Sequence, residues 1–346
     1  MTNIRAPKIS VCIPTYNRAD LLKQSVASVL NQAFYDYELI ISDNASQDGT
    51  AEVIKSFNDS RIIYISKEKN IGLVNNWNSC LAAAKGKYIT IFNDDDLMMP
   101  DNLAMKVQVL EGNRNAGLVH ANFHIIDEKG EIMKEGAHPN GYHDFEEAGL
   151  LFLKKNLLGN NQVVPPSPLI RKECFLRLGG FSEKILFTTD FEYWMRIAIH
   201  YGVMYLGKPL MKYRMYHNAG WTSSKYYTVI DGDTFVNLVG LEDEYTTRKI
   251  ILQLTKNILS EWGDMNVLVR KRMIASVNRL IEKQYLRYGK KSEAINSIFQ
   301  VCRKFPDLLF DISMTRLIIK ALFGHRATEL LKYLLMTHRE NKRMMS

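Results

Sequence analysis

Cysteine is scarce in this sequence: its 346 residues include four, Cys12, Cys80, Cys174 and Cys302. No two of them lie close together, whereas structural zinc sites and small disulfide-rich domains depend on closely spaced cysteines. A disulfide framework and a structural zinc site are therefore excluded as the basis of the fold. We expect a reduced, cytoplasmic protein with buried thiols.

Long apolar runs are also missing. No segment approaches the roughly 18 uncharged apolar residues of a membrane-spanning helix. Residues 1–8 hold no apolar core of signal-peptide length. Fixed-period repeats and low-complexity tracts are absent as well. The hydrophobic fraction of 46% is typical of a globular protein in water, and the length is sufficient for one large α/β domain and a smaller second unit.

Acidic residues are under-represented only toward the C-terminus. Residues 1–220 contain 24 basic and 24 acidic side chains, so the net charge of +8 arises entirely after them. Residues 265–346 contain 17 basic and 6 acidic side chains. From about residue 228 onward the spacing of apolar residues is almost entirely helical. We therefore predict two domains, 1–224 and a basic α-helical domain over 225–346.

The first domain alternates two kinds of pattern. Short apolar runs predict buried strands, and apolar residues at helical spacing predict the helices between them. Repeated units of this length predict an α/β fold with a mostly parallel sheet and helices on both faces. The predicted strands are 9–13, 37–41, 61–65 and 88–92, and the predicted helices cover about 21–30, 50–57 and 75–84.

Polar residues follow three of these strands. In parallel α/β sheets, ligands bind beyond the carboxyl ends of the strands, so residues 14–17, 43–44 and 93–96 can converge on one ligand. In such a site Tyr16 can stack on a base, and Asp43 can accept a hydrogen bond from a base imide or a ribose.

The third of these segments, Asn93-Asp94-Asp95-Asp96, places three carboxylates side by side. Adjacent carboxylates repel one another unless a cation or solvent relieves the repulsion. A hard divalent ion with oxygen ligands would do so and would then neutralise a diphosphate. The alternative is a solvated loop in which Asp96 caps a helix that starts near Pro100.

Five segments, in this order along the chain, resemble motifs of the family 2 glycosyltransferases. The resemblance implies their GT-A fold, which is Rossmann-like, and it covers roughly residues 9–222. The Gln-x-x-Arg-Trp motif of processive, membrane-spanning synthases is absent, so the resemblance is to the non-processive enzymes of bacterial surface-polysaccharide assembly. The segments are 11–18, 41–50, 92–100, 169–181 and 187–196.

The resemblance assigns a donor site, residue by residue. It implies that Pro14 and Tyr16 flank the base of the nucleotide sugar, that Asp43 contacts the base, and that Asp94 contacts the ribose. The donor that we expect is a UDP-sugar.

The resemblance also assigns catalytic and acceptor-side residues. Asp95 aligns with the metal-binding aspartate, and His217 lies where many relatives have a second protein ligand for Mn²⁺ or Mg²⁺. Asp190 aligns with the catalytic base, for which the alternative is an N-cap of the following helix. Gly180 and Trp221 are candidates for the acceptor side. A structural role remains the alternative for His217 and for Trp221.

Three positions depart from the family pattern: Asn93 replaces the first aspartate of the Asp-x-Asp motif, Ala45 replaces a glycine, and Thr189 replaces the glutamate before the base.

The reaction that the resemblance implies is a metal-dependent, inverting transfer of sugar to a hydroxyl of a glycan or lipid-linked glycan. Inversion follows when the acceptor attacks the face opposite the leaving diphosphate. A sugar-nucleotide-forming nucleotidyltransferase is the rival enzyme, but no Gly-rich phosphate loop follows the first strand.

The basic tail has alternatives of its own. Its apolar segments 308–312 and 317–323 carry flanking cations, which is typical of a helix at an anionic membrane surface. The alternative is a helical subdomain that packs on the first domain or on another copy of the chain. Nucleic-acid binding through this tail is the rival function, and we do not expect it because aromatic and basic residues are not interleaved as in known modules.

Overall fold

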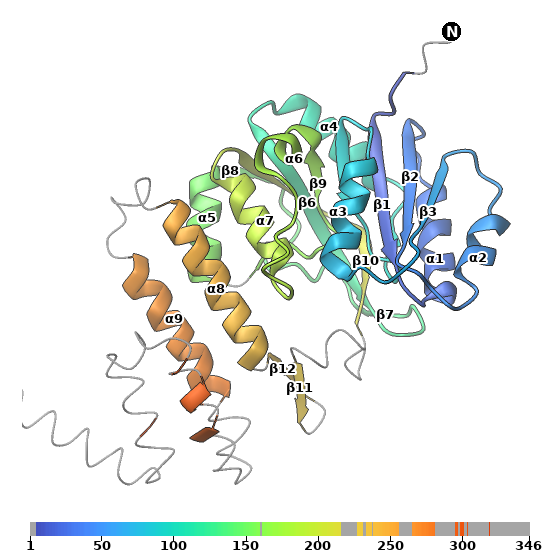
Figure 1. Ribbon diagram of the computed structural model, residues 1–346. Coiled ribbons are helices and arrows are strands. Elements are labelled where there is room, and N and C mark those ends of the chain that lie inside the picture. Colours follow the sequence, from blue (N-terminus) through green and yellow to red (C-terminus); the bar gives the residue numbers. More distant parts are fainter. Residues whose placement is uncertain are drawn as a thin grey trace, which may run out of the picture. The chain divides into compact units, whose positions relative to one another are not determined.

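The computed structural model describes residues 5–159, 161–215, 227–230, 233–236, 238–255 and 265–280, with a few isolated helical positions between 295 and 318. The chain divides into two compact units, Met1–His217 and Asn218–Ser346 (Figure 1). The domain boundary after residue 224 stays a prediction, because residues 216–226 lie outside the described part.

The first unit is built on a ten-stranded sheet with the order β3-β2-β1-β4-β9-β6-β10-β5, in which β7 pairs with β6 and β8 with β10. The pairs β1–β2, β2–β3, β1–β4 and β6–β10 are parallel. The strands are β1 Ile9–Thr15, β2 Tyr37–Asp43, β3 Ile62–Ser66, β4 Tyr88–Ile91, β5 Leu97–Met98, β6 Ala116–Ile126, β7 Ile132–Lys134, β8 Phe145–Glu147, β9 Leu169–Arg171 and β10 Gly202–Arg214.

Strand β9 is the exception within the centre of the sheet. It pairs antiparallel with β4 on one side and with β6 on the other, and thereby joins the two parallel parts. Its short length follows from its surroundings, because the extended Pro-rich segment before it and helix α6 after it leave three residues to pair. The predicted α/β class with a mostly parallel central sheet is confirmed.

Helices cover both faces of the sheet, as predicted (Figure 1). Alternate residues of β1 point to opposite faces: Ile9, Val11 and Ile13 belong to one core cluster, and Cys12 belongs to the other. The first cluster packs under α1, α2 and α4, and the second under α3, α5, α6 and α7. The helices are α1 Ala19–Leu30, α2 Thr50–Ser56, α3 Leu73–Ala83, α4 Asn102–Gly112, α5 Gly149–Leu158, α6 Lys172–Leu178 and α7 Thr189–Ala198.

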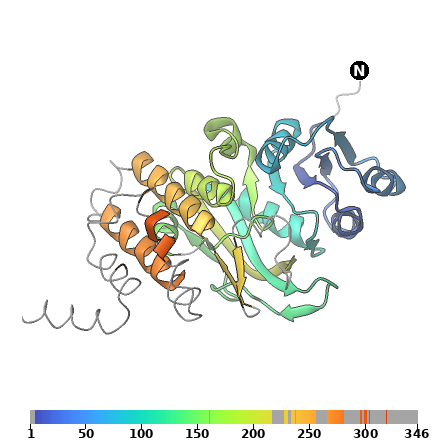
Figure 2. The ribbon, with the colours of Figure 1, turned by 60° about the horizontal axis from the view of Figure 1, so that its bottom comes forward.

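The described part of the second unit contains a hairpin and two longer helices. The strands β11 (Tyr227–Ile230) and β12 (Asp233–Val236) pair antiparallel where the sequence pattern indicates helix. Helices α8 (Leu238–Leu254) and α9 (Met265–Leu280) pack against each other, as Figure 2 shows. An ion pair between Glu244 and Arg248 spans one turn of α8. The predicted C-terminal helical subdomain is confirmed in this part.

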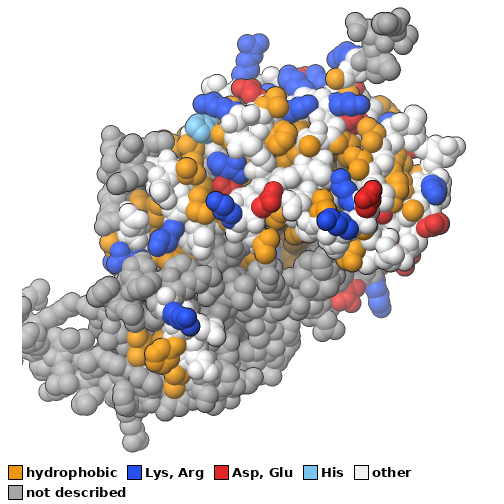
Figure 3. Space-filling view, viewed as in Figure 1, with side chains coloured by type: hydrophobic (Ala, Val, Ile, Leu, Met, Phe, Trp, Pro, Cys, Tyr) orange, Lys and Arg blue, Asp and Glu red, His pale blue; other side chains and the backbone are white. Residues whose placement is uncertain are grey.

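In the described ranges, no helix has the length and apolar character needed to cross a bilayer. On the face drawn in Figure 3, basic and acidic side chains both appear over the first unit, with apolar side chains scattered between them.

Candidate functional site

Three strand ends meet at one edge of the sheet. The parallel register pairs Thr15 at the end of β1 with Asp43 at the end of β2. Asn44 N–H donates to the Thr15 carbonyl at 3.0 Å, and Phe92 N–H, just after β4, donates to the Cys12 carbonyl at 2.8 Å. The three polar segments singled out in the sequence therefore lie side by side, as a parallel sheet requires.

Asp43 is 2% exposed and is held by the protein through both oxygens. The backbone N–H of Ser46 donates to Oδ1 at 2.9 Å, and the hydroxyl of Tyr64 donates to Oδ2 at 2.6 Å. Each carboxylate oxygen keeps a further lone pair for a ligand. Burial, and then the bond to Asp43, raise the pKa of Tyr64 to about 12, so this hydroxyl keeps its proton at neutral pH.

Two loops beside Asp43 are tied together. Asn17 N–H donates to Ser46 Oγ at 2.9 Å, and Asn17 Oδ1 accepts from Gln47 N–H at 2.7 Å. Asn17 and Ala45 both have positive φ, 52° and 66°, a backbone conformation that favours glycine. Pro14 lies buried within β1, and Tyr16 is half-buried just after it.

Asp94 is the first of the three adjacent carboxylates after β4 and is held by two side chains. It is 7% exposed, and it accepts from Thr15 Oγ1 at 2.8 Å and from Arg18 Nη1 at 3.2 Å. Burial raises the pKa of Asp94 to about 6, although the Arg18 charge opposes that shift. A buried carboxyl group with a pKa close to neutral pH is a common feature of functional sites.

Asp95 shares its cation with Asp94. The same Nη1 of Arg18 lies 2.7 Å from Asp95 Oδ2, and the Asp95 side chain is 12% exposed. Sequence reasoning did not single out Arg18, although it closes the first family-like segment. The signal was available, since Arg18 follows β1 by three residues and β1 neighbours the strand that leads into the acidic segment.

Asp96 turns into the protein. It is fully buried, with Oδ1 accepting from Arg214 N–H at 2.7 Å and Oδ2 accepting from Asn93 Nδ2 at 2.9 Å. Burial, and then the neighbouring Asp95, raise the pKa of Asp96. The alternative of a solvated loop with Asp96 as a helix cap is wrong, because the N-cap residue of α4 is Asp101.

The buried guanidinium of Arg214 holds the backbone of the acidic segment, residues 93–96, in place. Its Nε donates to the carbonyl of Asp95 at 2.8 Å, and Nη1 donates to the carbonyls of Asp127 and Glu128. Arg214 ends β10 three residues before His217, which lies outside the described residues. Within the described part of the chain, no three His, Cys, Asp or Glu side chains form a group able to hold a metal ion. The role of His217 as a ligand stays a prediction.

Asp190 lies in the first turn of α7 and is 6% exposed. The N-cap position belongs to Thr188, so the interpretation of Asp190 as the cap is wrong. Asn161 Nδ2 donates to Asp190 Oδ2 at 3.0 Å, and Asn161 Oδ1 accepts from Val163 N–H at 3.1 Å. Burial raises the pKa of Asp190 to about 6.

The topology places Asp190 at the same sheet edge as the acidic segment. Helix α7 leads into the start of β10, which runs parallel to β6, so the first turn of α7 lies toward the carboxyl ends of these strands. The segment with Asn161 precedes β9, and β9 is antiparallel to β4, so this segment also arrives from that edge. Sequence reasoning missed Asn161, whose contact with Asp190 spans 29 residues.

Gly180 has a structural reason of its own. Asn78 on α3 clamps the next residue, donating to the Phe181 carbonyl at 2.9 Å and accepting from its N–H at 2.8 Å. A Cβ on Gly180 would lie 2.3 Å from Asn78 Oδ1, so this close approach needs glycine. The acceptor-side role of Gly180 stays a prediction, and Trp221 lies outside the described residues.

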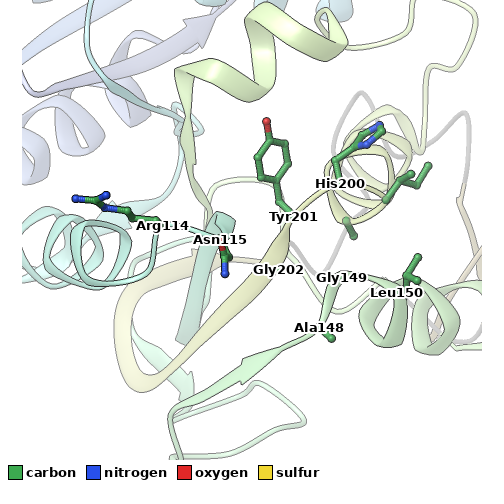
Figure 4. A pocket seen from close by; sticks show the side chains of 10 residues that line it. Arg114, Asn115, Ala148, Gly149, Leu150, His200, Tyr201 and Gly202 are labelled. Carbon is green, nitrogen blue, oxygen red and sulfur yellow. The ribbon is translucent and has the colours of Figure 1, made fainter.

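A pocket of about 430 Å³ lies elsewhere (Figure 4). It is formed by the start of α5, the segment after α7 and the starts of β6 and β10, which is the opposite edge of the sheet. None of the predicted site residues lines it, so we assign the site from converging polar groups rather than from the size of a cavity. Its lining residues include Arg114, Asn115, Gly149, His200 and Tyr201.

Comparison with known proteins agrees with this geometry. The family model described as glycosyl transferase family 2 matches residues 10–168. An uncharacterised glycosyltransferase of Methanocaldococcus jannaschii is 32% identical over 235 residues, which cover 64% of this chain and 78% of that protein.

Two solved structures share the fold. The crystal structure of S. aureus TarS 1-349 in complex with UDP-GlcNAc has a TM-score of 0.61 at 17% identity, covering 96% of this chain and 92% of TarS 1-349. The mannosyltransferase PcManGT from Pyrobaculum calidifontis, in complex with GDP-Man and Mn²⁺, has a TM-score of 0.51 at 15% identity, covering 92% of this chain and 88% of that one.

Proposed function

The chain belongs to glycosyl transferase family 2, and we propose that it moves a sugar from a UDP-sugar to a hydroxyl of a glycan or lipid-linked glycan, with inversion at the anomeric carbon. The pathway that we propose is bacterial surface-polysaccharide synthesis. One observation carries the proposal: Asp43, Asp94 and Asp95 converge at the strand edge where the first turn of α7 brings Asp190.

The donor half of the site is proposed to bind the nucleotide. Pro14 and Tyr16 would enclose the base, Asp43 would accept a hydrogen bond from it, and Asp94 would contact the ribose. The bonds from Ser46 and Tyr64 support this role of Asp43, because they fix the direction of its remaining lone pairs. The fold neighbour TarS in complex with UDP-GlcNAc supports the choice of nucleotide.

The acidic segment fits a divalent cation by its chemistry. Asp94 and Asp95 place carboxylate oxygens within reach of one cationic group, since one Arg18 nitrogen contacts both. Such oxygens are the preferred ligands of Mn²⁺ and Mg²⁺. We propose that Asp95 holds the ion, with His217 as a second ligand. When bound, the ion would supply Lewis-acid stabilisation to the diphosphate. The neighbour PcManGT in complex with GDP-Man and Mn²⁺ supports this choice.

Asp190 is proposed to take the proton from the acceptor hydroxyl. Burial raises its pKa to about 6, so at pH 7.5 it is mostly ionised while being a stronger base than an exposed carboxylate. Asn161 donates to one oxygen of Asp190 and thereby helps to orient the carboxylate. Gly180 and Trp221 remain our candidates for the acceptor side.

A panel of nucleotide sugars with Mn²⁺ or Mg²⁺ tests the proposal through released nucleoside diphosphate. Asp95→Asn and Asp190→Asn are expected to lower kcat by about a hundredfold or more, since positioned proton transfer alone contributes about that factor. The matched control is Asp36→Asn, a carboxylate before β2 that is remote from the site. Retained anomeric configuration of the product would contradict inversion, and released pyrophosphate would identify a nucleotidyltransferase.

The location of the reaction belongs to the same proposal. We place it in the cytoplasm. For the basic residues 265–346 we propose a helical subdomain that packs on the first domain or on another copy of the chain, and peripheral contact with an anionic membrane is the alternative. Most of these residues lie outside the described part. Pelleting with anionic liposomes tests the contact: salt-sensitive binding supports it, and a dimer without lipid binding contradicts it.

A further inference from the structure

One cationic group contacts two of the carboxylates in the acidic segment, including the proposed metal ligand Asp95. Arg18 Nη1 lies 3.2 Å from Asp94 Oδ1 and 2.7 Å from Asp95 Oδ2, and the Arg18 side chain is 16% exposed. A guanidinium shared between two carboxylates does electrostatically what a cation at the same oxygens would do. The acidic segment is therefore neutralised from within the chain.

The backbone around Arg18 is anchored by hydrogen bonds on both sides. Asn17 is bonded to Ser46 and Gln47, Ala19 N–H donates to Asp48 Oδ2 at 3.0 Å, and the Arg18 carbonyl accepts from Leu22 N–H at 2.9 Å. Any displacement of the guanidinium must therefore come from rotation of the side chain, with the loop and the start of α1 in place.

A divalent ion and the guanidinium compete for the same carboxylates. They carry charges of the same sign, and Arg18 Nη1 already lies 2.7 Å from Asp95 Oδ2, so each repels the other at this position. Binding of the ion therefore favours movement of the guanidinium away from the carboxylates. An arginine released beside a diphosphate has a new partner, because its planar fork matches phosphate oxygens in a bidentate manner.

We propose that Arg18 is an exchangeable counter-cation: it pairs with Asp94 and Asp95 in the free protein, gives way to the divalent ion, and then binds the diphosphate of the donor. This inference rests on the proposed function for the identity of the site. It adds a coupling between binding of the ion and binding of the nucleotide, which the proposed function does not require. The ion alone binds weakly because it must displace Arg18, and the nucleotide strengthens binding of the ion by giving the displaced guanidinium a partner.

Titration of Mn²⁺ followed by its electron paramagnetic resonance signal tests the exchange without turnover. Without nucleotide, Arg18→Met is expected to bind Mn²⁺ about tenfold more tightly than the wild type, since hydrogen bonds to charged groups are of that strength. With saturating UDP the wild type gains affinity for Mn²⁺, and Arg18→Met gains about tenfold less. Arg18→Lys, which keeps the charge but not the fork, is expected between the two.

Two control variants distinguish failure of the Arg18 exchange from failure of the metal assignment to Asp95. Lys23→Met removes an exposed cation from the same helix and is expected to bind Mn²⁺ as the wild type does. Asp95→Ala is expected to lose binding. Equal Mn²⁺ affinity of wild type, Arg18→Met and Arg18→Lys, with binding lost in Asp95→Ala, overturns the exchange and leaves the metal assignment standing. Unchanged binding in Asp95→Ala, or no binding in any variant, overturns both.

Discussion

The hydroxyl of Tyr64 donates a 2.6 Å hydrogen bond to Oδ2 of Asp43, so a residue of β3 orients the carboxylate that ends β2. Register places the two residues on neighbouring parallel strands, two positions apart. The proposed contact with the base therefore depends on a tyrosine outside every family-like segment.

Tyr64→Phe tests this dependence. We expect the KM for the donor, and the Kd for UDP, to rise about three- to tenfold, because Asp43 loses a hydrogen bond that fixes its direction. kcat should change less than twofold, since Tyr64 is remote from the reacting bond. Tyr35→Phe, at a residue that is 74% exposed, is the control. Equal UDP affinity in both variants would show that Asp43 needs no such support.

Asn161→Ala tests how Asp190 is held. The Asn161 amide stabilises the ionised form of this carboxylate, so removing it raises the pKa of Asp190 above the present value of about 6. The acidic limb of the kcat/KM profile should move to higher pH, with about a threefold loss at pH 6 and a loss below twofold at pH 8. Asn113→Ala, at the end of α4, is the control. A loss that is the same at every pH would indicate a purely structural role.

Ala45→Gly should stabilise the protein. At φ 66° an alanine is strained by roughly 1–2 kcal/mol, and glycine recovers this at an entropy cost of about 0.5–1 kcal/mol. We expect a gain of about 1 kcal/mol in urea unfolding. Ala51→Gly, in the first turn of α2, is the matched control, and it should lower stability by up to about the same amount. A loss in both variants would contradict the strain at residue 45.

Lys106→Met should change how stability depends on pH. Lys106 is 1% exposed, its Nζ donates to the Ser167 carbonyl at 2.5 Å, and no ion pair to it is formed among the described residues. Burial lowers its pKa from 10.5 to about 7. Between pH 7 and pH 10.5 the unfolded chain binds more protons at Lys106 than the folded chain does. The free energy of unfolding of the wild type therefore rises with pH across this window, and this gain is lost as the pH falls through 7.

The Lys106→Met variant lacks this pH-dependent contribution to stability. In urea unfolding, the stability advantage of Lys106→Met over the wild type should shrink by about 2 kcal/mol between pH 7 and pH 9. Lys23→Met, an exposed lysine on α1, should differ from the wild type by the same amount at both pH values. A pH-independent difference for Lys106→Met as well would mean that Lys106 stays protonated in the folded protein.

Local patterns were sufficient for the regular elements of the first unit. The predicted strand at 88–92 is β4 (Tyr88–Ile91), and the predicted helix at 50–57 is α2 (Thr50–Ser56). Both could be predicted because the spacing of apolar residues over a short window indicates a buried strand or an amphipathic helix. The predicted meeting of residues 14–17, 43–44 and 93–96 follows from parallel topology alone.

Long-range features could not be predicted in the same way. Strand β10 begins at Gly202 and contains register shifts that interrupt any simple alternation of buried and exposed residues. The hairpin at 227–236 was interpreted as helix, because short apolar runs are ambiguous between the two. The bond from Arg18 to Asp94 spans 76 residues, and its geometry depends on the turn at Asn17.

The short strand β9 has a mechanical consequence. Its three residues, Leu169–Arg171, are the seam between the half of the sheet that carries Asp43 and Asp94 and the half that continues through β6 to β10. Because only Leu169, Ile170 and Arg171 pair across this seam, we expect substitutions in β9 to weaken the connection between the half that carries the proposed donor site and the half that α7 leads into.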